Sequence, residues 1–120
     1  DATSGDNTAL TTKFTLTGGV GADSLYGAAG ADIISGGTGA DVLSGFGQAD
    51  IITGGAGDDT IKGGDETALT GVGDNLSGGS GADIIDGSLG GDILSGGAGA
   101  DVFYFNLKKP TIVFRIFVYI

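Results

Sequence analysis

The feature that most constrains this chain is a nine-residue phrase that repeats along most of its length. From Gly18 onward, consecutive units read GGVGADSLY, GAAGADIIS, GGTGADVLS, GFGQADIIT and GGAGDDTIK. A fifteen-residue unit, GGDETALTGVGDNLS, comes next, and GGSGADIID, GSLGGDILS and GGAGADVFY complete the series at Tyr104. Nine units therefore cover 87 of the 120 residues. A tandem period of this kind indicates a solenoid, in which each repeat stacks on its neighbours.

The consensus of the units is GGxGxDxUx, where U is a large apolar residue. Glycine at positions one, two and four lets a six-residue turn enter backbone conformations that are closed to residues with a Cβ. The last three residues favour a short strand whose central side chain points inward. The predicted inward residues are Leu25, Ile34, Leu43, Ile52, Ile61, Leu76, Ile85, Leu94 and Phe103.

This nonapeptide resembles the RTX, or hemolysin-type, calcium-binding repeat. The resemblance covers residues 18–104 and implies an all-β fold, a parallel β-roll (a β-helix solenoid) with two nonapeptides in each turn of the solenoid. It also implies that turns of like parity stack along each edge of the roll. Calcium would lie between stacked turns, held by backbone carbonyls and by the Asp side chain at position six.

Sorting the units by parity separates a regular set from an irregular one. We call the first, third, fifth, seventh and ninth units odd, the others even, and the two rows of stacked turns the odd edge and the even edge. All five odd turns fit the consensus, and five stacked turns leave four gaps for calcium. The predicted carboxylate ligands of the odd edge are Asp23, Asp41, Asp59, Asp83 and Asp101. The turn carbonyls assigned with them belong to Gly18, Gly19, Gly21, Gly36, Gly37, Gly39, Gly54, Gly55, Gly57, Gly78, Gly79, Gly81, Gly96, Gly97 and Gly99.

The even turns keep their aspartates but lose part of the glycine scaffold. Phe46 and Gln48 stand at positions two and four of GFGQAD, and residues 65–70 form an insertion in the enlarged unit. We expect the even edge to bind calcium more weakly or at fewer gaps, through Asp32, Asp50, Asp74 and Asp92.

Composition narrows the chemistry to hard oxygen ligands. The chain has no Cys and no His, which removes disulfides and the usual zinc, copper and haem ligands. The net charge is −10, which disfavours nucleic acid and anionic lipid as partners, whereas carboxylates and carbonyls suit calcium. No apolar stretch is long enough to predict a membrane span. Adjacent acids such as Asp58 and Asp59 lack a catalytic partner, so we expect no enzyme activity.

Calcium is expected to decide whether the chain folds. Glycine loses more conformational freedom on ordering than any other residue, and the predicted apolar core is small. Stacked aspartates repel one another without ions and become ligands when calcium is present, so that binding energy becomes folding energy. We expect disorder at cytosolic calcium and folding at roughly millimolar calcium, the range of extracellular modules.

The ends of the chain are predicted to differ from the roll. Residues 18–44 match residues 78–104 at an offset of sixty, which aligns Leu16 with Leu76. We therefore interpret residues 1–17 as a leading half-unit or capping strand that lacks its Asp, and residues 18–104 as the roll. Residues 105–120 form an apolar, basic tail without glycine, which is a possible cap strand or a foreign extension. The chain opens at Asp1 without Met, and we expect it to be a piece of a longer protein.

The resulting functional prediction is a non-catalytic calcium-binding module of a secreted or cell-surface protein. The resemblance implies export by type I secretion of the Gram-negative kind and an attached domain that carries the parent protein's activity. The alternative is a structural or adhesive solenoid, similar to an S-layer protein or an adhesin. In that case the flat sheet faces or the tail would mediate self-association or bind a partner.

Overall fold

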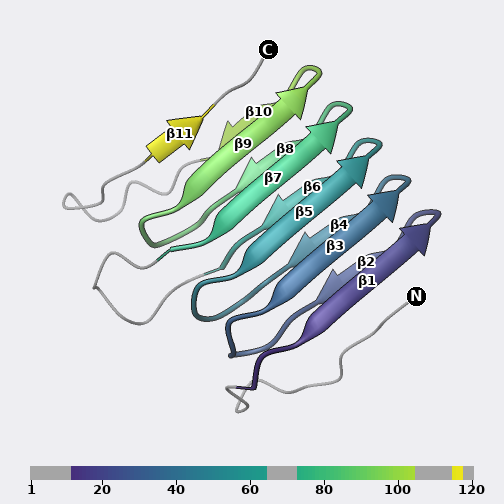
Figure 1. Ribbon diagram of the computed structural model, residues 1–120. Helices are drawn as coiled ribbons and strands as arrows, with labels where there is room; N and C mark the ends of the chain where they lie inside the picture. Colours follow the sequence, from purple (N-terminus) through teal and green to yellow (C-terminus); the bar gives the residue numbers. More distant parts are fainter. Residues whose placement is uncertain (1–11, 65–72, 105–114, 118–120) are drawn as a thin grey trace.

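The chain forms two parallel sheets stacked face to face. The computed structural model describes residues 12–64, 73–104 and 115–117, and every regular element within them is a strand (Figure 1). The first sheet, called the long-strand sheet, contains in spatial order β1 (Thr15–Val20), β3 (Ile33–Thr38), β5 (Ile51–Ala56), β7 (Asn75–Ser80), β9 (Ile93–Ala98) and β11 (Arg115–Phe117). The second, the short-strand sheet, contains β2 (Ser24–Tyr26), β4 (Val42–Ser44), β6 (Thr60–Lys62), β8 (Ile84–Asp86) and β10 (Val102–Tyr104).

The pairing register follows the repeat. Each strand of the roll pairs in parallel with the equivalent residues one turn of the solenoid away, as in Leu16 with Ile34 and Leu25 with Leu43. The same register crosses the enlarged unit, where Ile52 pairs with Leu76. One turn of the solenoid is therefore two nonapeptides, and the predicted parallel β-roll is confirmed.

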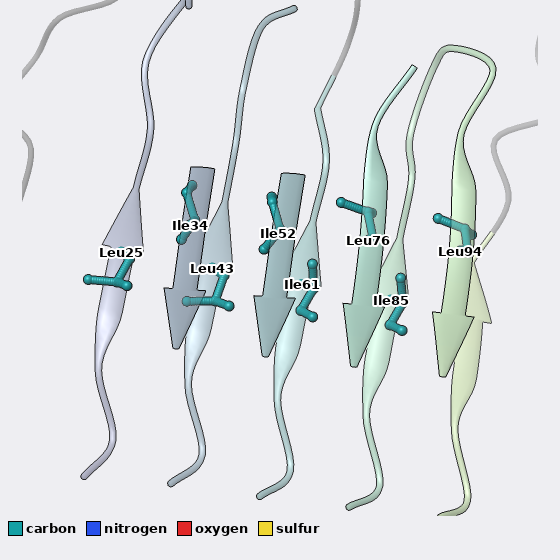
Figure 2. Packing of buried hydrophobic residues seen from close by; sticks show 8 residues of the cluster. All are labelled: Leu25, Ile34, Leu43, Ile52, Ile61, Leu76, Ile85 and Leu94. Carbon is teal, nitrogen blue, oxygen red and sulfur yellow. The ribbon is translucent and has the colours of Figure 1, made fainter. Parts of the chain in front are cut away.

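The core is a double column of aliphatic side chains between the sheets. Eight predicted inward residues are at most 2% exposed and form one cluster (Figure 2): Leu25, Ile34, Leu43, Ile52, Ile61, Leu76, Ile85 and Leu94. Leu16 and Phe103 pack against the two ends of this cluster and are only partly buried. Each turn of the solenoid thus buries one apolar side chain from each sheet, and fixing these positions fixes the register of both rows of turns.

The two sheets differ in strand length, which the sequence does not predict. Each unit is expected to supply a three-residue strand, and the short-strand sheet agrees. In the long-strand sheet, β3 continues through Ser35 into the first three residues of the next odd turn, so that Gly19 pairs with Gly37 and Gly37 with Gly55. The odd turns therefore begin as paired strand. In Figure 1 they are the tight loops beyond the arrowheads of the long strands, with the even turns at the opposite edge.

The ends of the roll are partly described. β1 begins at Thr15, within the segment 1–17 interpreted as a leading half-unit or capping strand, and pairs with β3. β11, from the C-terminal tail, pairs in parallel with β9 and extends the long-strand sheet (Figure 1). The predicted insertion at residues 65–70 and most of the segments 1–17 and 105–120 lie outside the described residues.

Candidate metal centres along the two edges

The position-six aspartates form two columns, one along each edge of the roll. Each Asp ends its turn immediately before a strand, so the stacking of strands also stacks the carboxylates. Seven of them are at most 1% exposed: Asp32, Asp41, Asp50, Asp59, Asp74, Asp83 and Asp92. Asp23 and Asp101, at the ends of the odd edge, are half-buried. Burial of so many carboxylates is costly unless something neutralises them.

One oxygen of each carboxylate is held by the backbone. On the odd edge, the Asp23 N–H donates to Asp41 Oδ1 and the Asp41 N–H to Asp59 Oδ1, both at 2.9 Å. The even edge repeats the pattern, with the Asp32 N–H donating to Asp50 Oδ1 at 2.7 Å. These bonds between successive turns fix the orientation of the carboxylates in the folded roll.

The second carboxylate oxygen, Oδ2, is the one that is available to bind a ligand in several of these turns. Among the described residues, five of these second oxygens are buried and accept no hydrogen bond: Asp41 Oδ2, Asp50 Oδ2, Asp59 Oδ2, Asp83 Oδ2 and Asp92 Oδ2. A charged acceptor that is buried and left without a donor destabilises the fold by more than an ordinary hydrogen bond contributes. These oxygens therefore require a ligand or a proton.

A backbone carbonyl of the next turn lies close to the same Oδ2 atom, beside the position-one glycine. The position that a Cβ on Gly36 would take lies 2.7 Å from the Gly54 carbonyl oxygen and against Asp41 Oδ2. On the even edge, the equivalent point beside Gly45 lies 2.9 Å from the Gly63 carbonyl oxygen and against Asp50 Oδ2. Two oxygens thus converge beside position one, in a space that only the absence of a side chain keeps open.

Burial raises the pKa of Asp50, Asp59, Asp83 and Asp92. The pKa of Asp50 rises to about 8, mainly through burial and with a smaller contribution from the neighbouring carboxylates, although the hydrogen bond from the Asp32 N–H lowers it. Burial likewise raises the pKa of Asp92 to about 6, and the pKa values of Asp59 and Asp83 also lie above their usual range. A cation in the gap would reverse this effect by stabilising the ionised form.

The arrangement fits a hard cation bound largely by backbone oxygens. In the part of the chain that the structure describes, no three acidic side chains gather at one point. The gaps beside Asp41, Asp50, Asp59 and Asp83 each offer one carboxylate oxygen without a donor among the described residues and a carbonyl of the following turn. Calcium accepts such mixed oxygen ligands in flexible geometry. The residues present therefore fit calcium, which would supply the missing positive charge between stacked turns.

Two even turns, residues 45–50 and 87–92, keep the positive φ of the odd turns at positions two and four, at a conformational cost. Among the described residues, three that are not glycine have a positive φ: Phe46 (81°), Gln48 (63°) and Ser88 (67°). All three stand at position two or four of an even turn, where the odd turns have glycine. Asp86 Oδ1 accepts hydrogen bonds from Ser88 N–H at 2.9 Å and Ser88 Oγ at 3.3 Å, which stabilises that turn. Loss of glycine has therefore strained these turns without abolishing them.

The structure adds site residues that the sequence analysis did not name. Position one of the even turns, Gly27, Gly45, Gly63 and Gly87, lies against the carboxylate of its own turn just as in the odd turns. The sequence could have indicated these residues, because position one is glycine in all nine units. Asp58 also acts between turns, since its Oδ1 accepts from the Ala82 N–H at 2.8 Å. The ligand roles assigned to the aspartates and to the odd-turn glycines remain predictions.

Comparison with known proteins agrees with this geometry. A family model described as RTX calcium-binding nonapeptide repeat (4 copies) matches residues 15–43, 44–66 and 70–105. Neither the curated proteins nor the solved structures give a match. Among the described residues, no helix is long and apolar enough to cross a membrane. The family match covers most of the chain and includes both columns of aspartates, so this protein belongs to the RTX calcium-binding repeat family and is a calcium-binding β-roll module.

Proposed function

We propose that this chain is a calcium-triggered folding module of a secreted or cell-surface protein and has no catalytic role of its own. The observation that carries the proposal is the set of buried Asp Oδ2 atoms that lack a donor and face a carbonyl of the next turn. In the absence of calcium, these carboxylates oppose the fold; with calcium, they hold adjacent turns together.

The odd edge is the proposed high-affinity edge. Its gaps are lined by Asp23, Asp41, Asp59, Asp83 and Asp101, and its turns have glycine at every position with a positive φ. The proposed occupancy is four ions on this edge and fewer, or more weakly bound, ions on the even edge.

The proposed location follows from the calcium requirement. Cytosolic calcium is far below the roughly millimolar level that modules of this type need, so the chain would stay unfolded until export. RTX repeats are typical of secreted proteins, which supports an extracellular or cell-surface location and type I export. An attached domain of the parent protein would then fold beside the roll.

Circular dichroism of the chain in excess chelator and in millimolar calcium tests the proposal. We expect a disordered spectrum in chelator and a strand-rich spectrum in calcium. Magnesium at the same concentration is the control, because its small ion demands near-octahedral geometry and should not replace calcium in these gaps. A strand-rich spectrum that persists in chelator would overturn the proposal.

A structural or adhesive role is the second candidate, and one surface favours it. The outer face of the short-strand sheet carries a row in register, Val42, Thr60, Ile84 and Val102, whose three aliphatic members are 40–47% exposed. Sedimentation of the calcium-loaded chain separates the candidates. Reversible assembly that depends on this row would support the adhesive role, and a monomer at all concentrations would oppose it.

A further inference from the structure

The first even turn, residues 27–32, differs from the turns that end at Asp41, Asp50, Asp59, Asp83 and Asp92 in how its carboxylate is satisfied. Asp32 Oδ1 accepts from the Phe14 N–H at 2.7 Å, and Asp32 Oδ2 accepts from the Ala28 N–H at 2.8 Å. Both oxygens therefore have a backbone donor. Asp32 is 1% exposed and Ala28 is 3% exposed, so this hydrogen bond is shielded from water.

The next turn on the same edge shows the contrast. At position two, the Phe46 N–H donates to the Gly63 carbonyl of the following turn at 2.8 Å, and Asp50 Oδ2 accepts no hydrogen bond from the described residues. Phe46 has a φ of 81°, whereas Ala28 is not among the residues with positive φ. In these two turns the backbone conformation at position two therefore differs together with the direction of the amide, which points to the next turn at Phe46 and to its own Asp at Ala28.

Asp32 is the first aspartate of the even column. One turn earlier on this edge, the Asp position is taken by Phe14, whose amide donates to Asp32. Among the described residues, Asp32 therefore has a neighbour in the column on one side only, at Asp50. Repulsion along the column is smaller here than at Asp50, which lies between Asp32 and Asp74.

We propose that the Ala28 amide takes the place of calcium at Asp32, so that the gap between turns 27–32 and 45–50 holds no ion. The inference rests on the proposed function, since it concerns which gaps of the calcium-binding roll are filled. An ion at Asp32 would have to displace the buried Ala28 amide from its hydrogen bond with Asp32 Oδ2. It would also have to drive Ala28 toward the left-handed region. The N-terminal end of the even edge is accordingly a turn that closes without metal.

Calcium stoichiometry of the full chain, measured by equilibrium dialysis at saturating calcium, tests the proposal. The variants are Asp32→Asn and its matched control Asp50→Asn, with circular dichroism in calcium confirming that each is folded. We expect Asp50→Asn to bind one ion fewer than the wild type and Asp32→Asn to bind the same number as the wild type. Loss of an ion in Asp32→Asn, or no loss in Asp50→Asn, would overturn the proposal.

A second pair of variants decides the matter if Asp32→Asn fails to fold. Ala28→Gly gives position two the residue found in the odd turns, and we expect it to gain one ion. Ala31→Gly, at position five of the same turn, is the control and should gain none. An unchanged count in Ala28→Gly would show that the amide does not close this gap. A wild type that binds no calcium at all would instead overturn the proposed function itself.

Discussion

Position one of each turn is where the addition of one Cβ atom would interfere most directly with the proposed calcium ligands. A Cβ on Gly36 would lie 2.7 Å from the Gly54 carbonyl oxygen and against Asp41 Oδ2, the two oxygens proposed to share an ion. The φ of Gly36 is not positive, so the requirement for glycine here is one of space and not of backbone conformation. At positions two and four the requirement is conformational as well.

Gly36→Ala is therefore expected to block one gap of the odd edge. The added methyl group would occupy the position of the ion's ligands, so we expect a higher calcium midpoint for folding and a loss of about 1–3 kcal/mol of stability in calcium. Calcium titration by circular dichroism measures both. Gly47→Ala is the control, because a Cβ there meets its nearest atom at 3.5 Å, an ordinary contact. Equal midpoints for the two variants would contradict this role for position one.

In the turn GFGQAD, replacing a strained residue by glycine is expected to increase stability, whereas Gly36→Ala is expected to decrease it. Gln48 has a φ of 63° and is exposed, so Gln48→Gly removes strain without removing buried contacts. We expect it to stabilise the calcium-loaded roll by about 1 kcal/mol, measured by thermal unfolding. Ala49→Gly, one residue away and without a positive φ, should destabilise it by about 0.5–1 kcal/mol. If both variants destabilise equally, the left-handed conformation at Gln48 carries no cost.

At the scale of elements, the two edges are built differently from the same nonapeptide. Odd turns emerge from six-residue strands whose pairing continues through position three, and even turns emerge from three-residue strands. The continued strand pairing aligns successive odd turns in the folded roll. The described parts of the even turns lack this continued strand pairing and contain Phe46, Gln48 and Ser88 in positive-φ conformations.

This difference predicts unequal effects of carboxylate loss. Asn at both Asp41 and Asp59 should raise the calcium midpoint of folding more than Asn at both Asp50 and Asp92. The comparison is matched in residue type and number, and each pair removes two buried oxygens that lack a donor. Equal shifts in the calcium titration would show that the edges bind calcium alike and that the lost glycines are unimportant.

The elements also show where sequence reasoning succeeds and where it stops. The period of eighteen residues specifies the parallel register and the inward column from Leu25 to Leu94, because only the central residue of each three-residue segment is large and apolar in every unit. The extra length of β3 and its equivalents depends on pairing between glycine-rich turn segments, which no side-chain pattern records. The inward amide of Ala28 likewise depends on one backbone dihedral angle, and alanine at position two does not specify it.

At the scale of the whole molecule, the roll has a narrow apolar core and a column of aspartate side chains along each of its two edges. Burial raises the pKa of Asp50 to about 8 and that of Asp92 to about 6, well above the value of 3.8 for a free Asp. At pH values between the free-Asp pKa of 3.8 and these raised pKa values, the folded chain binds more protons than the unfolded chain. The stabilising contribution of these groups is therefore fully present below about pH 4 and is lost as the pH rises through 6 to 8.

Protons and calcium are accordingly expected to act as alternatives. In chelator, lowering the pH from 8 to 5 should increase strand content, because protonated carboxyl groups no longer repel one another. In calcium, raising the pH from 6 to 8 should lower the calcium midpoint, because the ion no longer competes with a proton. Circular dichroism across a grid of pH and calcium checks both trends. A calcium midpoint that is independent of pH would contradict the raised pKa values.

The most direct test of the central claim is a crystal structure of the chain grown in calcium, with anomalous scattering used to locate the ions. The account predicts peaks between successive odd turns, each beside a position-one glycine such as Gly36 or Gly54 and within ligand distance of the adjacent Asp Oδ2. It also predicts no peak beside Gly27, where the Ala28 amide occupies Asp32. A folded roll with water alone between the odd turns would contradict the account.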